Sequence, residues 1–235
     1  DWVLRFGRMT GPKEPNMLPT DYRLGKHYGD QVEVEHSHEV DGQPGKIRLL
    51  AWRNRARLAG FREALAYGNA VAWVPDPMFG RQYIFNVRHD EKIKYGLGIN
   101  AEQALNANVG VFLRAMQADG RSETYAFTEV DHSLAAGLAI KGGPWQRADD
   151  TVGVSLLRHG LSRERRRYLA AGGLSFFIGD GALRYRPEAV FETYYSLNLV
   201  KGVWLTADYQ RMQNPAYNGD RGPVSFASLR FHAEY

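Results

Sequence analysis

Charged side chains recur at every second position in two neighbouring stretches of the sequence. Arg53, Arg55 and Arg57 form one set, and Glu33 and Glu35 form the other. Residues two apart lie on one face of a β-strand, so each set predicts a charged stripe. Two such stripes facing each other across a hairpin would select among solutes and hydrogen-bond their hydroxyl groups. The alternative is a ladder of cross-strand ion pairs that only stabilises a wall.

Two other combinations suggest metal or catalytic chemistry, and each has a simpler interpretation. His36 and His38 have a spacing suited to a metal, but no fixed acidic or cysteine partner accompanies them, which favours histidines without a metal. Asp180, Asp208 and His232 would need a nucleophile to act as a hydrolase, and the sequence has no Gly-x-Ser-x-Gly motif. We therefore expect no enzyme, no cofactor and no metal.

The composition excludes several classes of protein. The 235 residues include no cysteine, which excludes disulfides and thiol catalysis. Lys and Arg number 30 against 26 Asp and Glu, and both signs are spread along the chain, so a nucleic-acid partner is not expected. The mean hydropathy is −0.44, and no stretch approaches the roughly 18 apolar residues of a spanning helix.

Apolar and polar side chains alternate with period two through most of the chain, which is typical of strands with one apolar and one polar face. We expect an all-β, antiparallel fold with about ten strands in a single domain over residues 1–235. The predicted strands lie at 2–7, 32–37, 52–58, 95–102, 109–116, 133–141, 152–156, 191–199, 205–210 and 229–235.

The predicted connections alternate between short and long. Turn-forming residues indicate tight turns at 41–45, 106–108 and 200–202, and 141–150 is a longer member of the same series. Long connections lie at 11–27, 61–91, 160–187 and 214–223, and the one at 118–127 is intermediate. Ser162 should cap a helix over 163–171 that ends at Gly172 and Gly173. Such alternation is typical of outer-membrane barrels, which have short periplasmic turns and long outer loops.

The two faces of the strands favour a transmembrane β-barrel. The polar face carries small and charged residues suited to a wet lumen, and aromatic residues recur near the ends of the apolar face, as in interfacial girdles. A soluble sandwich or lipocalin-like barrel also alternates, so the pattern alone leaves that alternative open. The aromatic residues are Trp2, Trp52, Tyr95, Tyr209 and Tyr235.

The C-terminal part of the sequence resembles a known family. The run YLAAGGLSFFIGDGALRYRPEAVFETYYSLNLVKGVWLTADYQRMQNPAYNGDRGPVSFASLRFHAEY is similar to the end of the carbohydrate-selective porins of the OprB type. Upstream, DGRSETYAFTEVDHSLAAGLAIKG, WQRADDTVGV, and KEPN followed by DYR also resemble family segments. The resemblance implies an outer-membrane β-barrel of a Gram-negative bacterium that passes sugars by facilitated diffusion. Family barrels resemble sixteen-stranded structures on a longer chain, so ten strands would be part of such a barrel or a shortened variant.

These observations predict a porin for mono- or oligosaccharides. Its expected partners are permeating sugars, outer-membrane lipid and lipopolysaccharide, the barrel-assembly machinery, and a homo-oligomer or larger envelope complex. A non-conducting barrel that anchors an envelope or polysaccharide-export assembly is the main alternative, and a soluble sugar-binding β-domain is another. The predicted pore-lining residues are Glu33, Glu35, Arg53, Arg55, Arg57, Asn100, Glu102, Arg114, Glu192, Asp208 and Arg230.

The final stretch, LRFHAEY, alternates to its last residue. Leu229, Phe231 and Tyr235 should face lipid, while Arg230 and His232 should face the lumen. The resemblance to outer-membrane barrels implies that Phe231 and Tyr235 form the signal read by the assembly machinery.

Deletion of Tyr235 is expected to impair membrane insertion more than transport by the molecules that do insert, because the signal acts during assembly. Outer-membrane fractionation with quantitative immunoblotting measures insertion, and sugar flux per inserted molecule measures transport. Normal membrane levels of the truncated chain would contradict the assignment.

Overall fold

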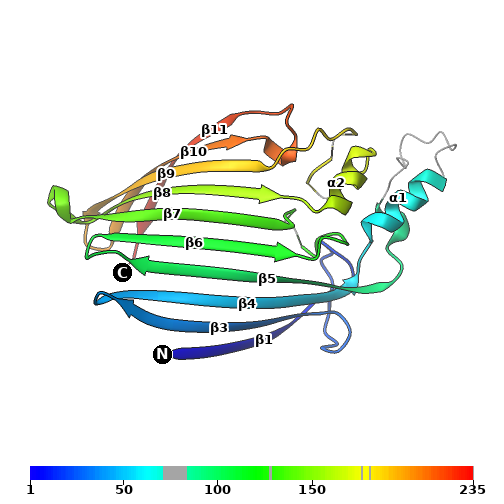
Figure 1. Ribbon diagram of the computed structural model, residues 1–235, viewed down its shortest axis with the longest axis horizontal. Helices are drawn as coiled ribbons and strands as arrows, with labels where there is room; N and C mark the ends of the chain where they lie inside the picture. Colours follow the sequence, from blue (N-terminus) through cyan, green and yellow to red (C-terminus); the bar gives the residue numbers. More distant parts are fainter. Residues whose placement is uncertain (71–83, 127–128, 176, 180, 235) are drawn as a thin grey trace.

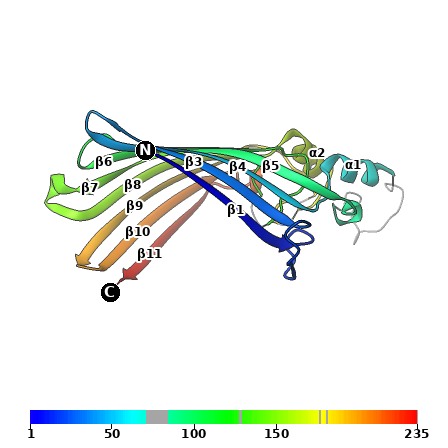
Figure 2. The same ribbon diagram turned by 90° about the horizontal axis from the view of Figure 1, so that it is seen from below.

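The computed structural model describes residues 1–70, 84–126, 129–175, 177–179 and 181–234. In these residues eleven strands form one antiparallel sheet in the order β11-β10-β9-β8-β7-β6-β5-β4-β3-β1-β2. The sheet is curved, and both chain termini lie at the end opposite helices α1 and α2 (Figures 1 and 2). No helix in the described part of the chain is long and apolar enough to cross a membrane.

The elements occur in the following order along the chain. They are β1 Trp2–Pro12, β2 Thr20–Asp21, β3 Tyr28–Val40, β4 Gln43–Arg57, α1 Phe61–Ala70, the 3₁₀ helix η1 Ile84–Val87, β5 Glu91–Ala104, β6 Val109–Ala118, β7 His132–Gly142, η2 Gly143–Trp145, β8 Arg147–Gly160, α2 Arg163–Ala170, β9 Glu188–Val200, β10 Val203–Gln213, η3 Pro215–Tyr217 and β11 Val224–Ala233.

The ten long strands coincide with the ten predicted from the period-two pattern, and each extends beyond the predicted segment at one or both ends. The eleventh strand, β2, has two residues and pairs with Gly11 and Pro12 of β1 inside the first long connection. Two residues are too few to show a period, so this strand left no signal in the sequence.

Short turns join the strands at one end of the sheet, and long connections join them at the other. The β3–β4 turn contains only Asp41 and Gly42, both with positive φ (52° and 72°), as a two-residue type I′ turn requires. The predicted turn at 41–45 is therefore too long, because Gln43 to Gly45 already belong to β4. The β7–β8 connection is likewise shorter than predicted and spans residues 143–146.

The long connections fold together into a hydrophobic core of their own. The helix predicted after Ser162 is confirmed as α2, and the Ser162 hydroxyl accepts a hydrogen bond from the backbone N–H of Arg165 at 3.1 Å. Helix α1 was not predicted and packs against α2 (Figure 1). We call this unit the loop core; its buried members are Ala59, Phe61, Ala64, Ile84, Leu161, Tyr168, Leu169, Ile178 and Tyr217.

Buried ion pairs fix the loop core to the sheet. The Arg165 guanidinium lies 2.8 Å from the Glu129 carboxylate and 3.2 Å from that of Asp131. Asp131 also lies 3.7 Å from the ammonium group of Lys94, a β5 side chain that is 1% exposed. The Tyr217 hydroxyl donates to the backbone carbonyl of Glu129 at 2.7 Å, and burial raises the pKa of Tyr217. Helix α2 therefore points Arg165 inward, which leaves Arg163 and Arg167 as its exposed arginines.

The sheet is open in the described residues. Strands β1 and β11 occupy opposite edges, apart from the two-residue β2, and no described pairing joins them (Figure 2). A barrel that spans lipid must pair every backbone group, so both edges require partner strands.

Arg165→Ala is expected to destabilise the loop core by about 3–5 kcal/mol, because it leaves Glu129 and Asp131 buried without their main cation. Limited proteolysis of the 161–187 connection measures the effect. The control is Arg163→Ala, which removes an exposed arginine of the same helix. Equal protease resistance of the two variants would contradict a role for the buried ion pairs.

Candidate functional site

The strand register assigns each side chain to one of two faces. The polar face carries Glu35 and its partner Arg48, and the apolar face carries Val34 and its partner Leu49. Large exposed hydrophobic residues lie on the apolar face along the middle of the strands, including Leu4, Phe6, Leu97 and Leu156. Near the long connections the polar face is covered, so that Ala56, Lys94 and Ala118 are at most 3% exposed. The loop core therefore closes over the polar face at that end.

A continuous network of charges crosses the polar face on the first strands. The Arg5 guanidinium of β1 lies 2.7 Å from Glu33 and 3.2 Å from Glu35, both on β3. Arg48 of β4 lies 2.6 Å from Glu35 and 3.0 Å from Glu102 of β5. Glu35 is only 5% exposed because three cations surround it, the third being Lys46 at 3.5 Å. We call this set the charged ladder; its members are Arg5, Glu33, Glu35, Lys46, Arg48 and Glu102.

Other predicted residues continue the polar face beyond the charged ladder. Asn100 pairs in register with Arg48 on one side and Arg114 on the other, and the Arg114 guanidinium lies 3.4 Å from the Asn100 amide oxygen. On the last three strands Glu192, Asp208 and Arg230 share this face by register. Eight of the eleven predicted pore-lining residues thus lie on the polar face.

Aromatic rings on the polar face lie over glycines of the adjacent strand. A Cβ on Gly96 would stand 2.6 Å from the Trp52 ring, and one on Gly137 would stand 2.6 Å from the Phe112 ring. The glycines leave room for the rings to lie against the sheet. The sequence prediction placed Trp52 on the apolar face, and this is wrong: it registers beside Gly96 on the polar face, where the covered end of the strand favours apolar side chains.

The predicted contact between the arginine stripe and the glutamate stripe is also wrong. Arg53, Arg55 and Arg57 lie on the opposite face from Glu33 and Glu35, in line with Leu49. Arg53 pairs with Asp30 at 2.9 Å, and Arg55 pairs with Glu91 at 2.7 Å. Arg8 binds the same Asp30 at 2.6 Å, so this end of the apolar face carries its own ion pairs.

The length of one turn explains this error. A five-residue turn at 41–45 would pair Val40 with Lys46 and Glu33 with Arg53, which puts the two stripes on one face. The two-residue turn pairs Val40 with Gln43 and Glu35 with Arg48. The difference is an odd number of residues, and a slip by an odd number moves every side chain to the other face. Recognition of Asp41-Gly42 as a type I′ signal would have identified Arg48 as the partner of Glu35.

Arg5, Lys46 and Arg48 belong to the site but were not among its predicted residues. The two-residue turn at Asp41 and Gly42 pairs Arg48 with Glu35, so the correct turn length would have predicted Arg48 as a member of the site. Arg5 sits in a strand whose partner is reached through a long connection, so no local signal fixes its register with Glu33. Lys46 precedes the predicted strand at 52–58, whereas β4 begins at Gln43.

The C-terminal strand has the predicted orientation of alternate residues, since Leu229 and Phe231 pair with Ala207 and Leu205 on the apolar face. Arg230 and His232 lie on the polar face. Tyr235, predicted as part of the assembly signal, lies outside the described residues, as does Asp180.

The two histidines with metal-like spacing lie on the apolar face and contact other groups. The His36 ring stacks on Trp2 at 4.3 Å and on His38 at 5.7 Å between centroids. His38 is 3.0 Å from the side-chain oxygen of Gln103. Within the described residues no group of three His, Cys, Asp or Glu side chains is arranged to hold a metal.

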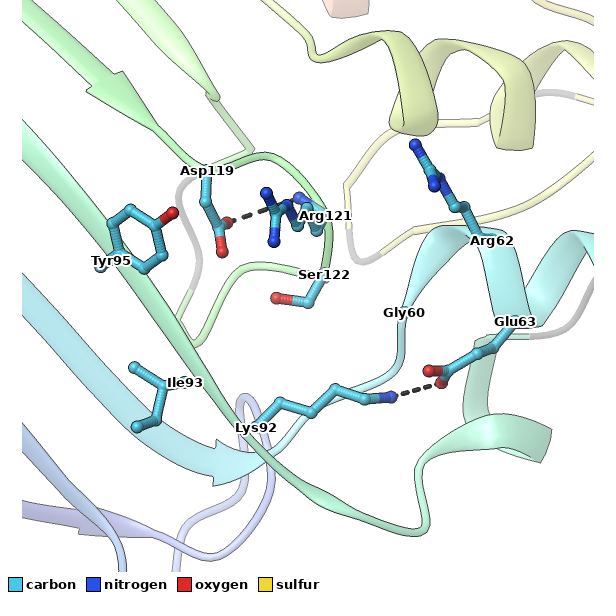
Figure 3. Close-up of a pocket in the computed structure, with 9 residues that line it drawn as sticks. All are labelled: Gly60, Arg62, Glu63, Lys92, Ile93, Tyr95, Asp119, Arg121 and Ser122. Carbon is cyan, nitrogen blue, oxygen red and sulfur yellow. Dashed lines mark hydrogen bonds and ion pairs between the residues drawn. The ribbon is translucent and has the colours of Figure 1, made fainter.

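A separate cavity of about 630 Å³ lies where β5, α1 and the 119–122 segment meet (Figure 3). Its wall includes Ile93 and Tyr95 of β5, and the Lys92 ammonium group pairs with Glu63 of α1 across it. Asp119 accepts a hydrogen bond from the backbone N–H of Arg121 at its rim. None of the predicted pore-lining residues contributes to it, so it is distinct from the charged ladder.

Comparison with known proteins identifies the family. The family model described as "Carbohydrate-selective porin, OprB family" matches residues 13–235. No curated protein matches the chain in sequence. The chain is similar in structure to the OprB of Pseudomonas putida, solved at high pH, with a TM-score of 0.68 and 17% identity. The match covers 88% of this chain and 49% of that one, so the chain spans about half the length of the solved protein. An antiparallel sheet with one charged face, together with a family match over nearly its whole length, shows that this chain belongs to the carbohydrate-selective porins of the OprB family.

Proposed function

We propose that this chain supplies part of the wall of an outer-membrane porin that passes carbohydrates by facilitated diffusion. The observation that carries the proposal is the charged ladder, which continues through Asn100 and Arg114 on one face of the sheet. In this arrangement the polar face lines the lumen and the apolar face contacts lipid. An arginine of the ladder turned toward the middle of the membrane would cost about 2–4 kcal/mol.

The charged ladder suits an uncharged, hydroxyl-rich solute. Guanidinium groups donate hydrogen bonds and carboxylates accept them, so a sugar can exchange its water contacts for contacts with Arg48 or Glu102. Each cation of the ladder lies beside a carboxylate, which limits the net field that a neutral solute meets. Contacts of this kind are individually weak, and weak binding at several sites permits passage rather than capture.

The direction of insertion follows from the connections. Barrels of outer membranes place short turns in the periplasm and long loops outside. By that rule the turn at Asp41 and Gly42 is periplasmic and the loop core is extracellular. The loop core covers the polar face at its outer end, so we infer that it narrows the entrance through which sugars arrive.

The wall needs further strands to close. Both edges of the described sheet carry unpaired backbone groups, and the solved OprB chain is about twice as long as the matched part. We infer that β1 and β11 pair with additional strands of the complete barrel. Phe231 and Tyr235 remain the proposed assembly signal, and lipopolysaccharide and the assembly machinery remain the proposed envelope partners.

The proposal is tested by swelling of liposomes that contain the membrane-extracted protein, in isotonic sugar solutions of increasing molecular size. We expect swelling that slows as the sugar grows, because passage is limited by the width of the lumen. Empty liposomes are the control. Correct insertion without swelling would overturn the porin function in favour of a non-conducting barrel, and a monomer that is soluble without detergent would favour a soluble sugar-binding domain.

Glu35→Gln is expected to shift ion selectivity toward anions, because it leaves Arg5, Lys46 and Arg48 around a neutral amide. Loss of one charge in a wet lumen is worth on the order of 1 kcal/mol, which corresponds to a change of about fivefold in the permeability ratio. The reversal potential across a planar bilayer in a salt gradient measures it. Asp41→Asn, which removes the same charge from a turn, should leave the potential unchanged; an equal shift in both variants would argue against a lumenal Glu35.

A further inference from the structure

Two exposed arginines lie at the outer end of the apolar face, on β8 and β10. Arg158 and Arg211 border the same cavity of about 400 Å³. Arg158 is two residues from the end of β8, and Arg211 is two residues from the end of β10. Both therefore lie at the level where the long connections begin.

The register places the two arginines on the two strands that flank β9, on the same face and offset from each other along the strands. Arg158 pairs with Ala189 of the intervening strand β9, and Arg211 pairs with the neighbouring apolar-face residue Phe191. The short side chain of Ala189 lies beside Arg158 and lines the cavity that both arginines border. In the part of the chain that the structure describes, neither arginine forms an ion pair with a carboxylate.

Other charges at the same level of the apolar face are neutralised. Arg8 and Arg53 share the carboxylate of Asp30 at 2.6 and 2.9 Å, and Arg55 pairs with Glu91. Arg158 and Arg211 thus stand apart as two adjacent cations without a counter-charge from the sheet. An arrangement of this kind complements a dianionic group, and arginine pairs bind phosphate oxygens in bidentate fashion.

The cavity beside the arginines is apolar. Its wall toward the middle of the sheet is formed by Leu134, Ala136, Leu156 and Phe191. Leu156 is 63% and Leu134 is 50% exposed, so these side chains are open to whatever surrounds the barrel. Ala136 is small and lies between larger residues, which hollows the surface. A molecule with a phosphate at one end and a hydrocarbon chain at the other would fit both parts.

We propose that Arg158, Arg211 and the adjacent apolar groove bind a phosphorylated glycolipid of the outer leaflet, with its phosphate between the guanidinium groups and an acyl chain over Leu156. The proposal rests on the proposed insertion of the chain with its long connections outward. That insertion places the arginines at the headgroup level, where a positive charge attracts anionic lipid at little desolvation cost. The site is separate from the lumen, because it lies on the opposite face of the sheet from Glu192 and Arg114.

The test uses the membrane-extracted protein in nanodiscs of zwitterionic phospholipid, titrated with diphosphoryl lipid A. The double variant R158Q/R211Q is expected to bind it at least about tenfold more weakly, because two charge-assisted contacts are lost. The control R163Q/R167Q removes two exposed arginines of α2 at the same end of the molecule but off this face. R158K/R211K should retain part of the affinity, because the charge remains while the bidentate geometry is lost.

Lipid A without its phosphates and free inorganic phosphate serve as competing probes. We expect neither to displace diphosphoryl lipid A at matched concentration, because each satisfies only one half of the site. Equal binding by R158Q/R211Q and the wild type, or equal losses in both double variants, would overturn the proposal. Sugar-dependent swelling should be the same for R158Q/R211Q and the wild type, because the site lies outside the lumen. A loss of swelling in the double variant would contradict the separation of this site from the pore.

Discussion

The register of one antiparallel sheet decides the chemistry of this protein, because successive side chains point to opposite faces. A slip of one residue would exchange the charged ladder for the leucines and valines of the apolar face. The two-residue turn at Asp41 and Gly42 sets the register between β3 and β4, since both residues adopt the positive φ of a type I′ turn. Glu35 and Arg48 then meet at 2.6 Å. The ion pair is thus a consequence of backbone geometry, and it adds a cost to any alternative pairing.

Each strand combines two environments along its length, which explains why simple alternation is an incomplete guide. On the apolar face of β4, Leu49 and Ala51 are followed by Arg53 and Arg55. On the polar face of the same strand, Arg48 and Leu50 are followed by Trp52, Asn54 and Ala56, of which Ala56 is fully buried. The first change marks the level at which hydrocarbon would give way to headgroups, and the second marks where the loop core replaces a wet lumen. Both changes occur at a similar height, near the long connections.

The position of the ten long strands, the alternation of connections and the helix after Ser162 were predictable, because each depends on local pattern. The pairing of Arg53 with Asp30 was not, because it depends on the exact length of a turn. Arg5 was missed for a different reason: a connection of fifteen residues, 13–27, separates β1 from β3, and nothing local sets the register across it. The loop core was also beyond local pattern, since Phe61, Tyr168 and Tyr217 come from three separate connections.

Buried ion pairs join the loop core to the sheet, which bears on how the entrance of the proposed porin is held in place. Lys94 belongs to the wall, Arg165 belongs to α2, and both contact the carboxylate of Asp131. Burying charge is costly unless every partner is in place, so the three groups tolerate few other arrangements of the loops. Arg165, Asp131 and Lys94 are each at most 1% exposed, so the ion pairs are shielded from bulk water. A loop held by packing alone could repack in several ways, whereas one held by a buried charge must return to the same position. In the proposed porin, the dimensions of the outer entrance therefore depend on Asp131 as well as on the strands that form the wall.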